Sequence, residues 1–272
     1  VAKQQCVGPL QLPLNNVGVM ALDFKSTEGI ATTVGHSPIA ALIDPVAGSR
    51  TAIAESLSNL VFAPINNGLA GVSLSANWMW ACNNEGEDAR LYEAVKGCSD
   101  FAIELGINIP TGKDSLSMKQ KYPNGENVIA PGTVIISAAG NCIDINKVVE
   151  PVLNKEAGSI YYINLSQDTF KLGGSSFAQI LNKIGNDVPT IKDGAYFKKA
   201  FNTIQNLIKN NLVEAGHDIG SGGLVTTLLE MTFADVNLGA NYDLSGLNEV
   251  DTVKVLFNEN IAVVLQAKED TS

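Results

Sequence analysis

The sequence predicts a protein that mixes strands and helices in two successive parts. Its 272 residues are 45% hydrophobic and 17% charged, enough for one large or two ordinary domains. Short apolar runs typical of buried strands, such as residues 17–22 and 134–139, alternate with stretches whose apolar residues recur at helical spacing. Residues 143–158 resemble a linker, and the pattern starts afresh after them.

The first part opens with Asn15 and Asn16, which precede the strand at 17–22. Residues at a strand entrance are common ligands and also common turn formers, and the sequence alone favours turn formers here. Residues 39–43 predict a second strand, ended by Asp44 and Pro45.

The next helix carries the first candidate site. Its apolar residues Ile53, Leu57 and Leu60 follow a helical period, and Glu55 and Asn59 lie four residues apart on one face. A carboxylate and a carboxamide in that relation can share a Mg²⁺ ion with substrate phosphates. Spacing alone favours a simpler interpretation, in which Glu55 complements the helix dipole and Asn59 lies near the C-cap.

Further along, acidic residues precede a periodic apolar set at 91–105, which predicts a helix ending at Gly106. The loop predicted after it contains Lys113, Ser115 and Ser117, a cation and hydroxyls suited to binding phosphate or carboxylate. It is not a Walker A sequence, and a polar surface loop is an equally good interpretation.

The second part predicts a strand at 159–165 and helices at 177–184, 195–210 and 224–232. Between the last two helices lies the glycine-rich stretch GHDIGSGG, in which Asp218 supplies a hard oxygen and the glycines allow close approach of a ligand. His217 would assist there or hydrogen-bond the loop. Strands are expected at 252–259 and 261–265.

Composition excludes several classes of function. The net charge of -10 and pI near 4.7 argue against nucleic acid or an anionic membrane as the main partner. The four scattered cysteines form no CxxC pair and there are two histidines, which argues against a zinc site and favours reduced thiols in the cytoplasm. No apolar run is long enough to span a bilayer. The first residue is Val1, and we expect a fragment of a longer chain.

Eight stretches together resemble the large, single-chain form of phosphoribosylformylglycinamidine synthase, the ATP-dependent amidotransferase of de novo purine synthesis. They are QCVGPLQLPL, RTAIAESLSNL, LSANWMW, NEGEDARLYEAV, GKDSLSM, LGGS, HDIGSGGLVTTLLEM and LFNEN. The resemblance runs through residues 4–266 and covers that family's second aminoimidazole-ribonucleotide-synthetase-like repeat.

The resemblance implies an α+β fold with mixed and antiparallel sheets and helices packed on one face. Residues 1–145 would form the N-terminal module, whose sheet pairs with that of the first repeat in a barrel. Residues 155–272 would form an incomplete C-terminal module.

The family binds ATP or ADP with magnesium in this repeat. By resemblance, Glu55, Asn59 and Asp218 would be metal ligands, and Asn15 and Gly220 would contact the nucleotide. Asn16 stands where the family has an aspartate ligand.

Two further positions depart from the family pattern: Gly220 replaces a serine and Ser221 an aspartate. The carboxylates lost at Asn16 and Ser221 weaken metal binding. Across the pseudo-two-fold axis, Lys113, Asp114, Ser115 and Ser117 would contact substrate or phosphate at the catalytic site.

The resemblance implies partners as well: the first repeat and the glutaminase domain of the same chain, and small nucleotide ligands. In isolation this region is expected to form a homodimer and to lack synthase activity. One alternative is a purely structural half with a decayed nucleotide site. Another is a free-standing relative, such as aminoimidazole ribonucleotide synthetase or a thiamine-phosphate or selenophosphate kinase-like enzyme.

Overall fold

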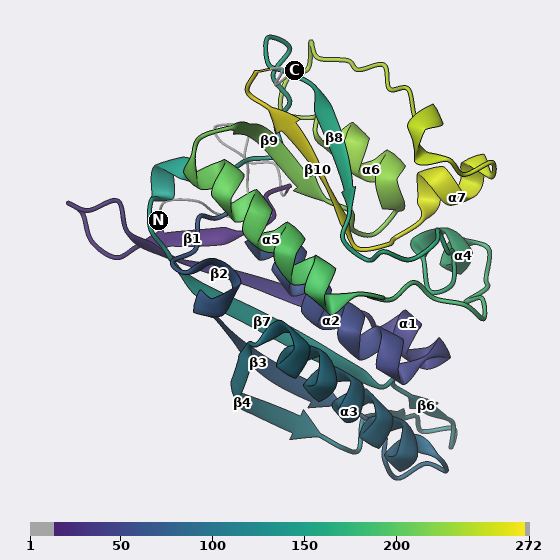
Figure 1. Ribbon diagram of the computed structural model, residues 1–272. Helices are drawn as coiled ribbons and strands as arrows, with labels where there is room; N and C mark the ends of the chain where they lie inside the picture. Colours follow the sequence, from purple (N-terminus) through teal and green to yellow (C-terminus); the bar gives the residue numbers. More distant parts are fainter. Residues whose placement is uncertain (1–13, 270–272) are drawn as a thin grey trace.

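The computed structural model describes residues 14–269, arranged around two sheets (Figure 1). The larger sheet has the order β1-β2-β7-β3-β4, in which all neighbours are antiparallel except the parallel pair β3 and β4. Its strands are β1 (Gly18–Ala21), β2 (Gly29–His36), β3 (Val72–Met79), β4 (Asn108–Ser115) and β7 (Thr133–Cys142). The predicted mixed sheet and α+β class are confirmed.

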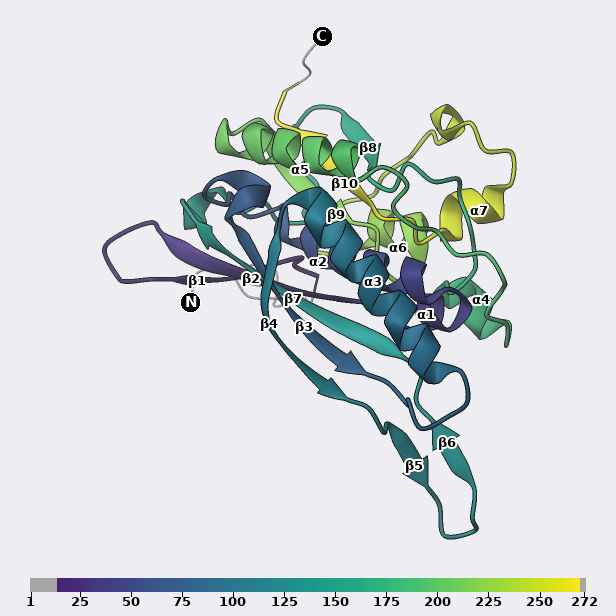
Figure 2. The ribbon, with the colours of Figure 1, turned by 60° about the horizontal axis from the view of Figure 1, so that its bottom comes forward.

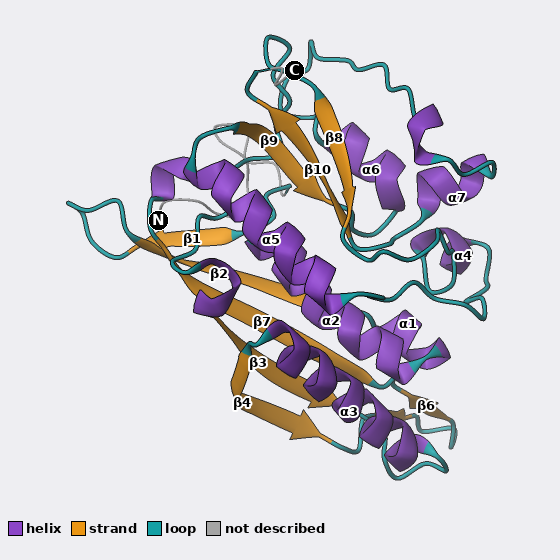
Figure 3. Cartoon of the chain, viewed as in Figure 1, coloured by secondary structure: helices purple, strands orange, loops and turns teal. Residues whose placement is uncertain are grey.

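Helices cover one face of this sheet. They are α1 (Pro38–Ile43), α2 (Pro45–Leu60) and α3 (Glu87–Leu105), and α2 packs on β2 and β7 (Figure 3). The helix predicted to carry Glu55 and Asn59 is therefore confirmed as α2, which begins after Asp44, whose side chain accepts a hydrogen bond from Ala47 N. The predicted stop at Gly106 is also confirmed, because its φ of 74° ends α3 in the left-handed region.

The smaller sheet is antiparallel, with the order β8-β10-β9. Its strands and the helices around it come from the second part of the chain: β8 (Ile160–Asn164), α4 (Ser176–Ile180), α5 (Gly194–Lys209), β9 (Val213–Asp218), α6 (Gly223–Glu230), α7 (Thr252–Phe257) and β10 (Ala262–Ala267). Short 3₁₀ helices are η2 (Gly68–Gly71), η3 (Ile145–Lys147) and η4 (Ser245–Leu247).

One continuous core joins the two parts. Helix α5 of the second part packs on α3, where the rings of Phe101 and Phe197 meet edge to face with centroids 5.9 Å apart. Gln205 of α5 is buried and anchors the chain after α2: its Oε1 accepts from Ile65 N at 2.7 Å, and its Nε2 donates to Val61 O at 2.7 Å. Helix α5 of the second part is thereby fixed against the end of α2.

Three sequence predictions of local structure are wrong. Residues 39–43 and 252–257 form helices α1 and α7 instead of strands. A short apolar run does not distinguish the two, and each run follows a helix-starting residue: Pro38 for α1, and for α7 Asp251, which accepts from Val253 N. The segment Lys113–Ser115 belongs to strand β4 and is not a loop.

The opposite face of the larger sheet is not covered by the described residues. Side chains of β2 alternate strictly between buried and exposed, and Met20, Ile30 and Val34 on the outer face are 62%, 42% and 54% exposed. Two hairpins extend beyond the sheet: the β1–β2 turn, and β5 (Lys119–Lys121) with β6 (Asn127–Ile129) (Figure 2). We call this outer surface, with the end of β4, the open side.

Within residues 14–269 no helix has both the length and the apolar content to cross a membrane. The motif at 5–14 lies almost entirely outside the described residues.

Candidate functional site

A cleft of about 300 Å³ lies where the two parts of the chain meet. The first part contributes the end of β2 and helices α1 and α2, including His36, Thr51 and Glu55. The second part contributes two glycine-containing loops, before α4 and before α6, and the residue Glu259 after α7.

Helix α2 brings Glu55 and Asn59 to the second part as the four-residue spacing predicts. Asn59 Nδ2 donates to Asp218 Oδ2 at 3.0 Å, across 159 residues of sequence, and also to Glu55 O at 2.9 Å. Glu55 Oε2 accepts from His36 N at 2.7 Å. Asn59 and Asp218 therefore meet directly, and Glu55 lies close enough for the charge of Asp218 to act on its carboxyl.

Asp218 is the last residue of β9, and the residue before it holds it in place. The preceding His217 is buried, with Nε2 2.9 Å from Glu230 Oε2 and Nδ1 2.6 Å from Asn16 Oδ1 and 3.3 Å from Asp218 Oδ1. Burial opposes the charge on this ring, but the hydrogen bonds to Asp218 and Glu230 outweigh it and raise the pKa of His217 to about 9. His217 is therefore an imidazolium at neutral pH that fixes the position of Asp218.

Asn16 belongs to the same hydrogen-bond network as His217 and Asp218. Its Nδ2 donates to Gly216 O at 3.1 Å, and its Oδ1 faces His217 and accepts from Asp218 N at 3.4 Å. The side chain thus connects the entrance of β1 to β9, across about 200 residues of sequence. Asn15 beside it is buried.

The cleft is acidic. Burial, with the nearby carboxylates of Asp218 and Glu259, raises the pKa of Glu55 to about 8, against the hydrogen bond from His36 N. No lysine or arginine is among the described residues that line this cleft. The described lining thus contains two acidic side chains, Glu55 and Glu259, and neither of these basic types, while the imidazolium of His217 pairs with the neighbouring Asp218.

The donor set fits magnesium held jointly with a ligand. In residues 14–269 no three His, Cys, Asp or Glu side chains are grouped closely enough to hold a metal ion by themselves. Mg²⁺ normally takes one or two protein carboxylates and completes its shell with phosphate and water oxygens. Glu55 and Asp218, with the carboxamide of Asn59, supply such a partial set.

The two departures in the loop before α6 lie at the wall of the cleft. Gly220 and Ser221 both line it. A Cβ built on Gly220 would meet only Asp218 Oδ2, at 3.8 Å, so the position has room for a side chain. Neither residue contributes a carboxylate, which leaves the loop with Asp218 alone.

Glu259 is a cleft residue that sequence reasoning missed. Its Oε1 accepts from Ser176 N and from Gly222 N, both at 2.8 Å. The residue lies in the LFNEN stretch of the family resemblance, but nothing in the sequence pattern indicated that it would meet two distant loops.

Lys113, Asp114, Ser115 and Ser117 lie away from this cleft. In the sheet β4 is three strand spacings from β2, about 14 Å. Lys113 Nζ donates to Asp114 O at 2.7 Å and contacts Ser115 Oγ. Lys113 and Asp114 are exposed, and Ser115 is partly buried. Ser117 forms an isolated bridge with Ala81. The segment borders a shallow hollow beside Trp78 and Ile109.

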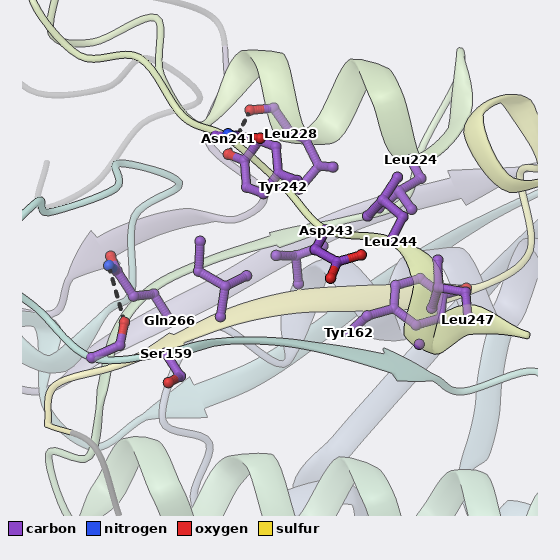
Figure 4. A pocket seen from close by; sticks show the side chains of 14 residues that line it. Ser159, Tyr162, Leu224, Leu228, Asn241, Tyr242, Asp243, Leu244, Leu247 and Gln266 are labelled. Atoms are coloured by element: carbon purple, nitrogen blue, oxygen red, sulfur yellow. Dashed lines mark hydrogen bonds between the residues drawn. The ribbon is translucent and has the colours of Figure 1, made fainter.

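A larger cavity, of about 510 Å³, lies between the outer face of the smaller sheet and helix α6 (Figure 4). Tyr162, Tyr242 and Asp243 are among its lining residues, and Tyr242 Oη donates to Leu228 O at 3.3 Å. It contains none of the site residues predicted from sequence.

The fold resembles solved structures of nucleotide-binding enzymes. "T. maritima PurL complexed with AMPPCP" matches with a TM-score of 0.65 and 16% identity, over 94% of this chain and 38% of that one. "AaThiL complexed with AMPPCP and TMP" matches with a TM-score of 0.53 and 11% identity, over 93% and 79%. At these identities the likeness shows the fold alone.

Family models identify both parts. Residues 1–141 match the FGAR-AT PurM N-like domain, and residues 160–270 match the C-terminal domain of AIR synthase related proteins. The chain belongs to the phosphoribosylformylglycinamidine synthase family.

Curated relatives agree with this assignment. A probable chloroplastic/mitochondrial phosphoribosylformylglycinamidine synthase of Arabidopsis thaliana is 46% identical over 98% of this chain, and the Homo sapiens synthase is 42% identical over 99%. The chain spans only 19% and 20% of their respective lengths. The alternative of a free-standing synthetase or kinase-like relative is set aside.

Proposed function

We propose that this chain is the second synthetase-like repeat of a phosphoribosylformylglycinamidine synthase, with modules at 1–145 and 155–272, and that its cleft binds ATP or ADP with magnesium. The observation that carries the proposal is the meeting of Glu55 and Asn59 on α2 with Asp218 at the end of β9. Core packing through Gln205 supports this meeting, because it fixes α2 against the second part.

Each predicted residue has a role in this proposal. Glu55, Asn59 and Asp218 would hold the magnesium ion, and Asn16 would act behind them by positioning His217 and Asp218. Gly220 lines the cleft and would contact the nucleotide, whereas Asn15, which is buried and is not among the lining residues, would need to reach it from beside Asn16. When bound, the metal would neutralise phosphate charge that the acidic cleft itself cannot balance.

The longer enzyme would convert ATP, formylglycinamide ribonucleotide, glutamine and water to formylglycinamidine ribonucleotide, ADP, phosphate and glutamate. The substrate's amide oxygen is phosphorylated, and ammonia released from glutamine displaces the phosphate. Lys113, Asp114, Ser115 and Ser117 would contact substrate or phosphate across the interface with the first repeat. The first repeat and the glutaminase domain would supply the remaining groups.

The open side supports pairing with another sheet. Its exposed apolar side chains, Met20, Ile30 and Val34, lie on a continuous antiparallel surface. The proposed occupant is the sheet of the first repeat. In its absence a second copy of this chain would take that place as a homodimer.

A second candidate function is a purely structural half whose nucleotide site has decayed. Two observations favour it: Asn16 is engaged with His217 and Gly216, and the amide of Asn59 donates to Asp218, so candidate ligands bond one another. This candidate retains the sheet pairing and the contacts of the open side.

Calorimetry with ADP, with and without magnesium, separates the two candidates. We expect magnesium-dependent binding that Asp218→Ala weakens by about 30-fold or more, because the variant removes a buried charged ligand. Lys113→Ala is the matched control and should bind as the parent does. Equal binding by Asp218→Ala, or no binding by the complete enzyme's second repeat, would support the structural half instead.

A further inference from the structure

Glu259 lies between two asparagines that fix its backbone. Asn258 Nδ2 donates to Lys254 O at 2.8 Å and to Val255 O at 2.9 Å, which closes the end of α7. Asn260 Nδ2 donates to Thr169 O at 3.0 Å. Both asparagines are fully buried. The segment between α7 and β10 therefore has little freedom, and Glu259 is presented to the cleft from a rigid base.

One oxygen of Glu259 joins two separate loops. Oε1 accepts from Ser176 N, the first residue of α4, and from Gly222 N, just before α6, at 2.8 Å each. Amides at the start of a helix have no partner within the helix, and a carboxylate is a strong acceptor for them. These bonds span 83 and 37 residues of sequence, so they fix the spacing of the loops.

Both loops depend on glycine conformations. Gly174 has a φ of 77°, and Gly222 and Gly223 have φ values of 92° and 76°. Such backbone is costly for other residues and loses much entropy when it is ordered. A group that holds both loops at once therefore lowers the cost of forming the cleft wall.

We propose that Glu259 is a positioning residue that holds the loops at 172–176 and 220–223 at the separation the nucleotide requires. The inference rests on the proposed function for the nucleotide and on the observed bonds for the positioning. It assigns the role to hydrogen-bond geometry: both bonds end on one oxygen, and a glutamine at this position retains an equivalent acceptor.

The competing role for Glu259 is purely electrostatic, since its charge also acts on Glu55. The two roles predict different behaviour for the variants Glu259→Gln and Glu259→Ala. Positioning predicts that Glu259→Gln resembles the parent and Glu259→Ala does not. An electrostatic or metal-binding role predicts that both variants fail alike.

Hydrogen–deuterium exchange on the purified, ligand-free protein tests the positioning. Glu259→Ala should raise exchange about tenfold in both segments, 173–180 and 220–226, because each loses a charge-assisted bond. Glu259→Gln should stay within about threefold of the parent. The matched control is Glu104→Ala: Glu104 Oε1 likewise accepts from a helix-start amide, Gly194 N at 2.9 Å, outside the cleft. It should leave both segments unchanged.

Calorimetry with ADP and magnesium on the same proteins links positioning to binding. We expect Glu259→Ala to bind at least about tenfold more weakly, with Glu259→Gln and Glu104→Ala close to the parent. Parent-like binding and exchange by Glu259→Ala would overturn this inference and leave the proposed function intact. Weakened ADP binding in both Glu259→Ala and Glu259→Gln would overturn the positioning role and support the electrostatic one. A parent that binds no ADP would overturn the proposed function and the link to it, while the exchange data would still decide whether Glu259 holds the loops.

Discussion

The cleft and the open side of the larger sheet carry the two groups of predicted site residues, and they differ in how those residues are held. Beside the cleft, in the wall that Glu55, Ile219 and Gly220 line, Asn59, Asp218 and His217 bond one another or partners on distant elements. On the open side, Lys113 bonds only its immediate neighbours, Asp114 and Ser115, and is exposed. The side chains beside the cleft are held by contacts within this chain, whereas we propose that those of the open side are fixed by contact with another surface.

The largest expected effect on stability comes from His217→Ala. Removing the imidazolium leaves Glu230 and the buried Asp218 without their shared partner, and should lower the free energy of unfolding by about 3 kcal/mol. Denaturant unfolding would measure it. Lys113→Ala should change the same quantity by less than about 0.5 kcal/mol. Similar losses of unfolding free energy in His217→Ala and Lys113→Ala would show that the two regions are held equally firmly, contrary to this prediction.

A pH series sharpens the account of the cleft. A carboxyl with a pKa of about 8 is mostly protonated at pH 7, and a cation must displace that proton. Affinity for magnesium-bound ADP should therefore rise about tenfold per pH unit up to pH 8 and level off above it. Calorimetry in buffers of different ionisation enthalpy would detect the released proton, and Glu55→Gln should abolish the release.

The same titrations affect stability without ligand. The pKa of Glu55 is raised from 4.5 to about 8, and that of His217 from 6.5 to about 9. Protons are thus bound more tightly by the folded state, so stability should be greatest at low pH within these windows and fall as pH rises through 8 and 9. A rise in stability over that range would contradict both assignments.

For the open side, Lys113→Ala should reduce synthase activity of the complete enzyme by about tenfold if the proposed role holds, because it would then remove a charge-assisted hydrogen-bond donor to substrate or phosphate. ADP binding in the cleft should not change. Full activity of the variant would remove Lys113 from the catalytic contacts.

The smallest expected effect on folding comes from Val34→Asp on the outer face of β2. Val34 is 54% exposed, so the free energy of unfolding should change by no more than about 0.5 kcal/mol. The added charge on the apolar outer face should abolish self-association of the isolated repeat. Light scattering at micromolar concentration would show it. Ile103→Asp, at an exposed apolar position on α3, is the control and should associate as the parent does. A parent that is already monomeric would contradict the homodimer.

Periodicity in the sequence predicts the long helices well. Helices α2, α3 and α5 extend over 16, 19 and 16 residues, long enough for their apolar periods to be unambiguous. The segments at 39–43 and 252–257 are too short for that, and their capping residues decided the outcome. Lys113 to Ser115 are polar on an exposed edge strand, so no alternation of burial marked them as a strand.

The candidate site was only partly predictable. The spacing of Glu55 and Asn59 indicates a shared helix face, and the resemblance adds Asp218. The bond from Asn59 to Asp218, the position of Asn16 behind His217, and the joining of two loops by Glu259 depend on tertiary packing across 37 to 201 residues. Local sequence patterns contain no information about such pairs.

Paramagnetic broadening by manganese tests the central claim most directly. Mn²⁺ replaces Mg²⁺ at oxygen ligands, and in the presence of ADP it broadens the NMR signals of nearby amides. The account predicts that amides of Glu55, Asp218 and Gly220 broaden first, and those of Gly112, Ser115 and Ser117 least. Broadening that begins in the 112–117 segment, or that favours neither region, would contradict a metal–nucleotide site in the cleft.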